Sequence, residues 1–128
     1  MANVAIVGGS REVRLLIKGL LRLHHHQVVA DGPTFDALGS PPAGSEPEVY
    51  VVDLDVGDEA RLEAVRASRK ARPNARFVVL TPSGAPSGRE SARSVGANAI
   101  VARPFAVRDL IEAVAPTSGK PGAPPHQP

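Results

Sequence analysis

The chain has 128 residues, the usual size of a single domain, and 42% of them are hydrophobic. It contains no cysteine, which excludes disulfides, thiolate metal ligands and cysteine nucleophiles. No apolar run approaches the roughly 20 residues that a membrane-spanning helix needs, and the first residues lack the basic start of a signal peptide. We therefore expect a cytoplasmic protein that does not enter the membrane.

The formal net charge of +2 hides an uneven distribution. Residues 1–64 carry five Lys or Arg and ten Asp or Glu, whereas residues 65–128 carry ten and three. Such polarity is typical of a protein that contacts an acidic partner or phosphate groups. A solvated surface rich in arginine would show the same pattern, so charge alone does not select a partner.

The predicted elements alternate between strand and helix along the chain. The apolar run 2–7 predicts a first strand that ends at Gly8 and Gly9, and Ser10 is placed to cap a helix over residues 11–23. The apolar stripe expected on this helix consists of Val13, Leu16, Ile17, Leu20 and Leu23. Four further strands are predicted at 27–30, 48–55, 76–80 and 98–102.

The predicted helices between these strands differ in strength. They cover residues 34–38, 58–71 and 89–95, followed by a final helix with the stripe Val107, Leu110, Ile111 and Val114. The segment 48–55 lacks clear alternation of polar and apolar residues, which is typical of a strand buried on both faces. Residues 116–128 are rich in Pro and Gly, and we expect them to be disordered.

This alternation predicts an α/β fold, a doubly wound five-stranded parallel sheet with helices on both faces. Ligands bind such sheets at the carboxyl ends of the strands. The residues at those ends are Gly8, Gly9, Asp53, Thr81 and Arg103. Any chemistry of this chain is therefore expected among these five positions.

Three motifs, at the right separations, carry a resemblance to a known family. They are PEVYVVDLD, ending near Asp53, FVVLT, ending at Thr81, and GANAIVARPF, which contains Arg103. With these motifs, residues 1–115 resemble a response-regulator receiver domain of the CheY-like family. The resemblance implies strand order 2-1-3-4-5 in a flavodoxin-like three-layer sandwich. It also implies that Asp53 occupies the phosphoacceptor position and Thr81 that of the hydroxyl residue.

The chain departs from the family where magnesium would be held. Family members carry two acidic residues after the first strand, and here these positions are Gly8 and Gly9. Magnesium requires oxygen ligands in near-octahedral geometry. Only Asp53 and Asp55 are left to supply them, so we expect a degenerate site that binds Mg²⁺ weakly at best. No other cofactor is implied.

Three more positions of the resemblance are altered. Arg103 replaces the family lysine, and its planar fork could hold Asp53 or turn outward to the basic surface. We expect the Arg103–Pro104 bond to be cis, as the family's Lys-Pro bond usually is. Ile100 occupies the position of the aromatic switch residue, and Pro82 follows Thr81 where a small residue is usual.

These departures predict an atypical receiver, or pseudo-receiver, of bacterial-type two-component signal transduction. We expect it to stand alone, to have no enzymatic activity and to act by binding another protein. Phosphorylation-dependent switching would be absent or weak. The alternative is a receiver that is still phosphorylated at Asp53 in a phosphorelay.

A basic surface is the candidate contact with that protein. The family commonly uses its fourth helix, fifth strand and fifth helix for dimer and output contacts. Here this face carries Arg89, Arg93, Arg103 and Arg108. A kinase, a scaffold or an output protein would fit such a face, and a second copy of the chain is a further alternative.

Other functions receive less support from the residues. Gly8 and Gly9 could open a dinucleotide-binding loop, but the third glycine position of that fingerprint holds a large residue. The run His24–His26 could bind a metal, although adjacent residues at a helix end do not converge on one centre. Arginines could bind nucleic-acid phosphates, yet the 3% aromatic content offers little for base stacking.

Overall fold

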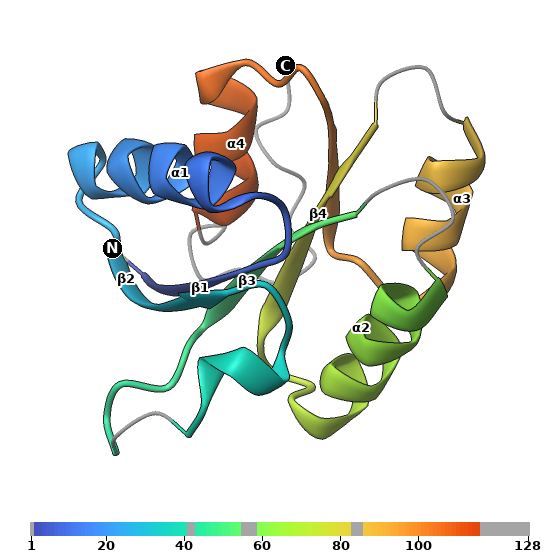
Figure 1. The fold of residues 1–128 in the computed structure, drawn as a ribbon, viewed down its shortest axis with the longest axis horizontal. Helices are drawn as coiled ribbons and strands as arrows, with labels where there is room; N and C mark the ends of the chain where they lie inside the picture. Colours follow the sequence, from blue (N-terminus) through green and yellow to red (C-terminus); the bar gives the residue numbers. More distant parts are fainter. Residues whose placement is uncertain (1, 41–42, 55–58, 83–85, 116–128) are drawn as a thin grey trace.

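The computed structural model describes residues 2–40, 43–54, 59–82 and 86–115, and Figure 1 shows their arrangement. Five parallel strands form one sheet in the order β2-β1-β3-β4-β5, which confirms the predicted fold class and strand order. The strands are β1 (Asn3–Val7), β2 (Gln27–Gly32), β3 (Val49–Asp53), β4 (Arg76–Thr81) and β5 (Ala99–Ala102).

Helices cover both faces of this sheet. They are α1 (Arg11–Leu23), α2 (Glu59–Ala71), α3 (Pro86–Ser94) and α4 (Val107–Val114), with a short 3₁₀ helix η1 (Asp36–Leu38) after β2. Figure 1 shows α1 and α4 on one face and α2 and α3 on the other. The segment predicted as a second helix is thus a single 3₁₀ turn, and the fourth and fifth helices of the sequence prediction are α3 and α4.

The sheet separates two hydrophobic cores. On one face, Ile17 and Leu21 of α1 and Leu110 of α4 pack with strand residues such as Ile6 and Val51. The second core, on the other face, is built by Val65 of α2 and Val95 after α3 against Val7, Val52 and Phe77. All five residues of β3 are buried. This confirms the prediction, from its unbroken apolar pattern, that this strand is covered on both faces.

The helix α1 begins where the sequence predicts but turns a different face to the core. Ser10 caps it by accepting a hydrogen bond from the Val13 N–H at 3.1 Å. The predicted buried stripe is wrong at two positions, because Leu16 and Leu23 are 56% and 73% exposed. Leucines occur all around this helix, so spacing alone did not identify which row faces the sheet.

Several predictions fall outside the described residues. Asp55, expected beside Asp53, lies in the range 55–58, and the predicted disordered tail is the range 116–128. The remaining site positions all lie in described segments, at or just after the carboxyl ends of the strands.

Candidate functional site at the carboxyl ends of the strands

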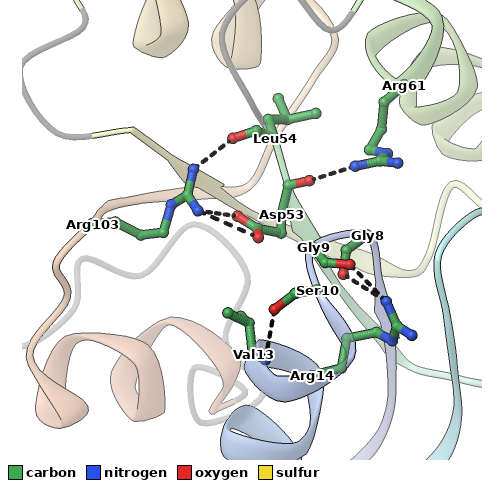
Figure 2. Close-up of polar contacts among 9 residues, drawn as sticks. All are labelled: Gly8, Gly9, Ser10, Val13, Arg14, Asp53, Leu54, Arg61 and Arg103. Atoms are coloured by element: carbon green, nitrogen blue, oxygen red, sulfur yellow. Dashed lines mark hydrogen bonds and ion pairs between the residues drawn. The ribbon is translucent and has the colours of Figure 1, made fainter.

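Asp53 is the centre of the candidate site. It is the last residue of β3 and only 2% exposed, and its carboxylate faces Arg103, which follows β5 (Figure 2). The Arg103 Nη1 atom lies 3.3 Å from Asp53 Oδ1 and 3.5 Å from Oδ2. The carboxylate at the expected phosphoacceptor position is therefore paired with the guanidinium group of Arg103.

Two further contacts fix Arg103 in this orientation. Its Nη2 donates to the carbonyl of Leu54 at 3.0 Å, and its backbone N–H donates to the carbonyl of Thr81 at 2.8 Å. The Arg103–Pro104 peptide is cis, as predicted. Of the two orientations that the sequence left open, the structure has the inward one, and the side chain is 28% exposed. Arg103 belongs to the Asp53 cluster, and the predicted partner surface is left with the other three arginines.

Gly8 and Gly9 form the wall of the site opposite Arg103. Both have positive φ angles, +89° and +75°, a conformation that glycine adopts without strain. A Cβ atom on Gly9 would collide with Asp53 Oδ2. A Cβ atom on Gly8 would lie 2.7 Å from the Asp53 carbonyl and 2.6 Å from Arg61 Nη1. The glycines therefore allow the loop to close against Asp53, and the backbone as it stands leaves no space for larger residues.

Arg61 is a site residue that sequence reasoning missed. From the first turns of α2 it donates through Nη1 to the backbone carbonyl of Asp53 at 3.1 Å. Its Nη2 donates to the carbonyl of Pro33 at 3.0 Å, so one side chain joins the ends of β3 and β2. In the sequence it is one of many arginines in a charged helix, and no motif marks it. A guanidinium thus lies beside Gly8, where the family carries an acid.

A third arginine, Arg14, holds the turn formed by Gly8 and Gly9. Arg14 of α1 donates through Nη1 to the Gly9 carbonyl at 2.7 Å, and its Nε lies 3.5 Å from Asp31 Oδ2. Lys18 pairs with the other oxygen of Asp31 at 3.0 Å. The hydrogen bond from Lys18 is the largest cause that lowers the pKa of Asp31 below its usual value. These contacts hold the turn that approaches Asp53.

Thr81 and Ile100 lie where the family resemblance places them. Thr81 ends β4 and is 2% exposed. It lies one residue beyond Leu80, the residue with which Asp53 pairs in the sheet register, so Thr81 and Asp53 end neighbouring strands at the same edge of the sheet. Ile100 lies within β5, half-buried against the second core, and Pro82 follows Thr81, also half-buried. An aliphatic side chain at position 100 carries no hydroxyl or ring with which to contact Thr81.

The described residues do not fit magnesium. No cluster of three or more acidic or histidine side chains suited to a metal occurs in the ranges that the structure describes. Asp53 is instead paired with Arg103, and no carboxylate can be built onto Gly9 without moving Asp53. A divalent cation would have to approach a carboxylate already neutralised by a fixed positive charge, which Coulomb repulsion opposes.

The histidine run forms the end of α1 rather than a metal centre. His24 caps the helix, and its Nδ1 lies 3.0 Å from the Leu20 carbonyl. His26 is buried and its Nδ1 accepts the Ala2 N–H at 3.1 Å. Burial, first, and the positive amino terminus, second, lower the pKa of His26.

All four arginines of the basic stretch 66–76 make contacts within the protein. Arg69 donates to the Gly96 carbonyl at 3.1 Å, Arg76 donates to the Ala113 carbonyl at 2.6 Å, and Arg72 lies 5.7 Å over the Tyr50 ring. Arg66 pairs with Glu63. These contacts weaken the nucleic-acid alternative. Arg89, Arg93 and Arg108, by contrast, are exposed on α3 and α4.

The chain was compared with known protein families and with curated proteins. No family model matches the chain. It is 34% identical over 93 residues to the photosynthetic apparatus regulatory protein RegA of Rhodovulum sulfidophilum, covering 72% of this chain and 51% of that protein. It is 32% identical over 82 residues to the acid tolerance regulatory protein ActR of Sinorhizobium medicae, covering 64% and 42%. The chain thus spans about half the length of the curated relatives that it matches.

Solved structures of receiver domains share the fold of this chain. A response regulator receiver domain protein from Clostridium thermocellum superposes with a TM-score of 0.75 at 19% identity, covering 89% of this chain and 91% of that chain. None of the helices in the described ranges combines the length and apolar character that crossing a membrane requires. The sheet order and these structural matches together show that the chain has the fold of CheY-like response-regulator receiver domains.

Proposed function

We propose that this receiver domain signals by binding a protein partner while Asp53 stays locked by Arg103, with phosphorylation-driven switching absent or weak. The observation that carries the proposal is the ion pair between the buried Asp53 carboxylate and Arg103. Its support is the crowding at Gly9, which leaves no place for the missing acid. The proposed setting is bacterial-type two-component signalling in the cytoplasm.

The lock acts on the nucleophile itself. A carboxylate attacks phosphorus only if one oxygen can approach the donor in line, free of competing partners. Here both oxygens of Asp53 face one guanidinium, and the Arg103 fork is also bound to the Leu54 carbonyl. Moving Arg103 would break both its ion pair with Asp53 and its hydrogen bond to the Leu54 carbonyl. The locked pocket therefore favours one conformation in place of two.

The proposed partner surface lies around the edge strand β5. α3 and α4 contact this strand, and they present the exposed side chains of Arg89, Arg93 and Arg108. Three cations with no described ion pair to an acid suit a protein with an acidic face, because charge complementarity raises association rates and selectivity. A kinase, a scaffold or an output protein could carry such a face.

Chemical phosphorylation tests the lock. The protein is incubated with acetyl phosphate and Mg²⁺, and separately with beryllofluoride and Mg²⁺, and its intact mass and amide NMR spectrum are recorded. We expect no adduct and no spectral change beyond those of the Asp53→Asn variant. A stoichiometric adduct in the native protein that is absent from Asp53→Asn would overturn the lock and establish the phosphorelay alternative.

Affinity capture tests the surface independently of Asp53. The native protein and Arg89→Glu/Arg93→Glu are used as baits in extract from the source cell, with Arg66→Glu/Lys70→Glu on α2 as the matched control. We expect a protein held by the native and control baits and lost from the α3 variant. Equal capture by all three baits would move the interface elsewhere.

A further inference from the structure

A cavity lies on the α2 face of the sheet, where the chain crosses from β2 to β3. Its volume is about 470 Å³, and residues of β2, η1, β3 and α2 line it. Ligand cavities in proteins commonly measure about 300–1,000 Å³. The other three crossovers each contain a helix of 9 to 13 residues, whereas this one contains only the three residues of η1. So short a turn leaves part of the sheet face uncovered.

Aromatic side chains gather at this cavity, although the chain has only three Phe and one Tyr. Three of these four contact one another: the Tyr50 and Phe77 rings stack with centroids 4.9 Å apart, and Phe35 lies 6.0 Å from Tyr50 at a tilt of 37°. Phe35 and Tyr50 line the cavity itself, together with Val29 and Leu38. Walls of this composition favour a flat apolar ring, which can extend the aromatic cluster.

The hydroxyl group of Tyr50 lacks a partner within the described part of the chain. Tyr50 is only 3% exposed, yet none of the described residues forms a hydrogen bond with its hydroxyl group. Buried tyrosine hydroxyls normally have such a partner, because an unsatisfied polar group loses its bonds to water without replacement. Burial raises the pKa of Tyr50, so the hydroxyl group keeps its proton at neutral pH and can donate it. A ligand oxygen in the cavity would accept that bond.

Arg72 adds a positive charge to the same cavity. It follows α2 directly, and its guanidinium carbon lies 5.7 Å from the centre of the Tyr50 ring. Arg72 lines the cavity, and no acidic side chain in the described ranges pairs with it. Asp36 of η1 also lines the cavity, but it is exposed to solvent, where its charge is screened. Arg72 therefore favours an anion, above all a carboxylate, which a guanidinium can bind with two parallel hydrogen bonds.

We propose that this cavity binds a small planar aromatic carboxylate, with its ring against Phe35 and Tyr50 and its carboxylate at Arg72. The aromatic wall selects a flat ring, and the guanidinium selects the negative charge. An uncharged aromatic compound would fit the wall but leave Arg72 unpaired. An aromatic cation would be repelled by Arg72, and an anion without a flat ring would leave the wall unused.

The cavity is separate from the Asp53 site. Tyr50 lies three residues before Asp53 in β3, so about 10 Å of extended strand separates the two positions. None of the arginines around Asp53 lines the cavity, and neither do the exposed arginines of α3 and α4. The proposal therefore depends neither on the lock nor on the partner surface around β5, and either can fail without affecting it.

An NMR titration with three matched probes tests the ligand class. The ¹⁵N-labelled protein receives 2-naphthoate, its uncharged analogue 2-naphthamide, or the non-aromatic anion cyclohexanecarboxylate. We expect 2-naphthoate to cause saturable amide shifts at Val29, Leu38 and Ser68, with a dissociation constant on the order of 0.1–1 mM for a ligand of this size. The other two probes should bind about fivefold more weakly or less, because each lacks one of the two contacts.

The results that would overturn the proposal are distinct. One is the absence of saturable shifts with 2-naphthoate up to about 5 mM. Another is equal affinity for 2-naphthoate and 2-naphthamide. A third is a set of shifts confined to Arg89, Arg93 and Arg108, which would assign the anion to the basic surface.

Charge variants test the role of Arg72. Arg72→Gln should weaken 2-naphthoate binding about fivefold and leave 2-naphthamide binding unchanged. Asp36→Asn should strengthen 2-naphthoate binding about twofold, because it removes a charge that repels the anion. The matched control is Lys70→Gln, an exposed position of α2 outside the cavity, which should bind as the native protein does. Equal weakening in Lys70→Gln and Arg72→Gln would show a response to overall charge and contradict the site.

Tyr50→Phe tests the hydroxyl group while keeping the ring. The variant should bind 2-naphthoate about threefold more weakly, because one hydrogen bond to the ligand is lost. In the free protein it should melt at the same temperature or higher, since the hydroxyl group that it removes has no partner in the described structure. A variant that melts at a lower temperature and binds 2-naphthoate as tightly as the native protein would contradict the proposed role of this hydroxyl group.

Discussion

The glycines at the end of β1 and the glycine in α1 lie in opposite surroundings. Gly8 and Gly9 have positive φ angles and press against Asp53 and Arg61, so that any Cβ atom would collide. Gly19 lies in regular helix with open space around it. Contacts within the protein require Gly8 and Gly9, whereas no contact within the described structure requires a glycine at position 19. The difference separates a closed site from an open surface.

The closed site is the basis of our proposal that phosphorylation-driven switching is absent or weak in this receiver fold. Family members use carboxylates after the first strand, whereas this chain uses the space for the turn itself and surrounds Asp53 with arginines from α2 and from the end of β5. Such a pocket is electrically satisfied as it stands. Our proposal therefore places signalling on an exposed surface, the arginines around β5.

The largest expected effect is at Gly9. Gly9→Ala should lower the free energy of unfolding by about 3 kcal/mol, because the alanine meets both an unfavourable φ angle and the Asp53 carboxylate. The matched control is Gly44→Ala, where the glycine has φ +86° but open space around its Cβ position. Denaturant titration should give the control a loss of only about 1 kcal/mol. Equal losses in the two variants would mean that Gly9 is not crowded.

The next effect concerns the ion pair. Arg103→Gln should cost about 2–3 kcal/mol of stability at neutral pH, because a buried carboxylate loses a charged partner. In the double variant with Asp53→Asn the loss should shrink, giving a coupling free energy of about 1–3 kcal/mol in a double-mutant cycle. Strictly additive losses would show that the two side chains do not hold each other.

A substitution at Gly19 is expected to change stability less, and in the opposite direction. Gly19→Ala should raise the free energy of unfolding by about 1 kcal/mol, measured by denaturant titration. Since Gly9→Ala is expected to destabilise, the same substitution at two positions would change stability in opposite directions. A loss of stability at position 19 would contradict the open surroundings seen in the structure.

The smallest effect is the pH dependence due to His26. Its pKa is lowered by burial, then by the positive amino terminus and the neighbouring His24 and His25. The unfolded chain therefore binds a proton more readily, and stability falls as the pH drops below the unfolded value of about 6.5. Protonation of Nδ1 would also break its bond to the Ala2 N–H. Melting curves from pH 7.5 to 5.5 should show this loss, and His26→Gln should reduce the slope.

The fold was predictable because its signals are local. Alternating strands and helices, the uninterrupted apolar segment that becomes β3, and the Ser10 cap all follow from neighbouring residues. Asp53, Thr81 and Arg103 were predicted because strand ends converge in a parallel sheet. The resemblance to receiver domains also drew attention to these positions, because it implies a role for each of them.

The parts that sequence reasoning missed depend on distance in space. Arg61 resembles the other arginines of α2 until the fold brings it under the Asp53 carbonyl. The crowding at Gly9 is a property of two loops that meet only in three dimensions. The outward leucines of α1 escaped notice because leucine spacing fits either face of that helix.

Magnesium binding is the most direct test of the locked site. The ¹⁵N-labelled protein is titrated with MgCl₂ into the millimolar range, and the amide resonances of Gly9, Asp53 and Leu54 are followed, with Asp53→Asn as the control. The account predicts only small, unsaturable shifts that are equal in both proteins. Saturable shifts centred on these three residues, absent from Asp53→Asn, would show that the pocket binds the cation and would contradict the lock.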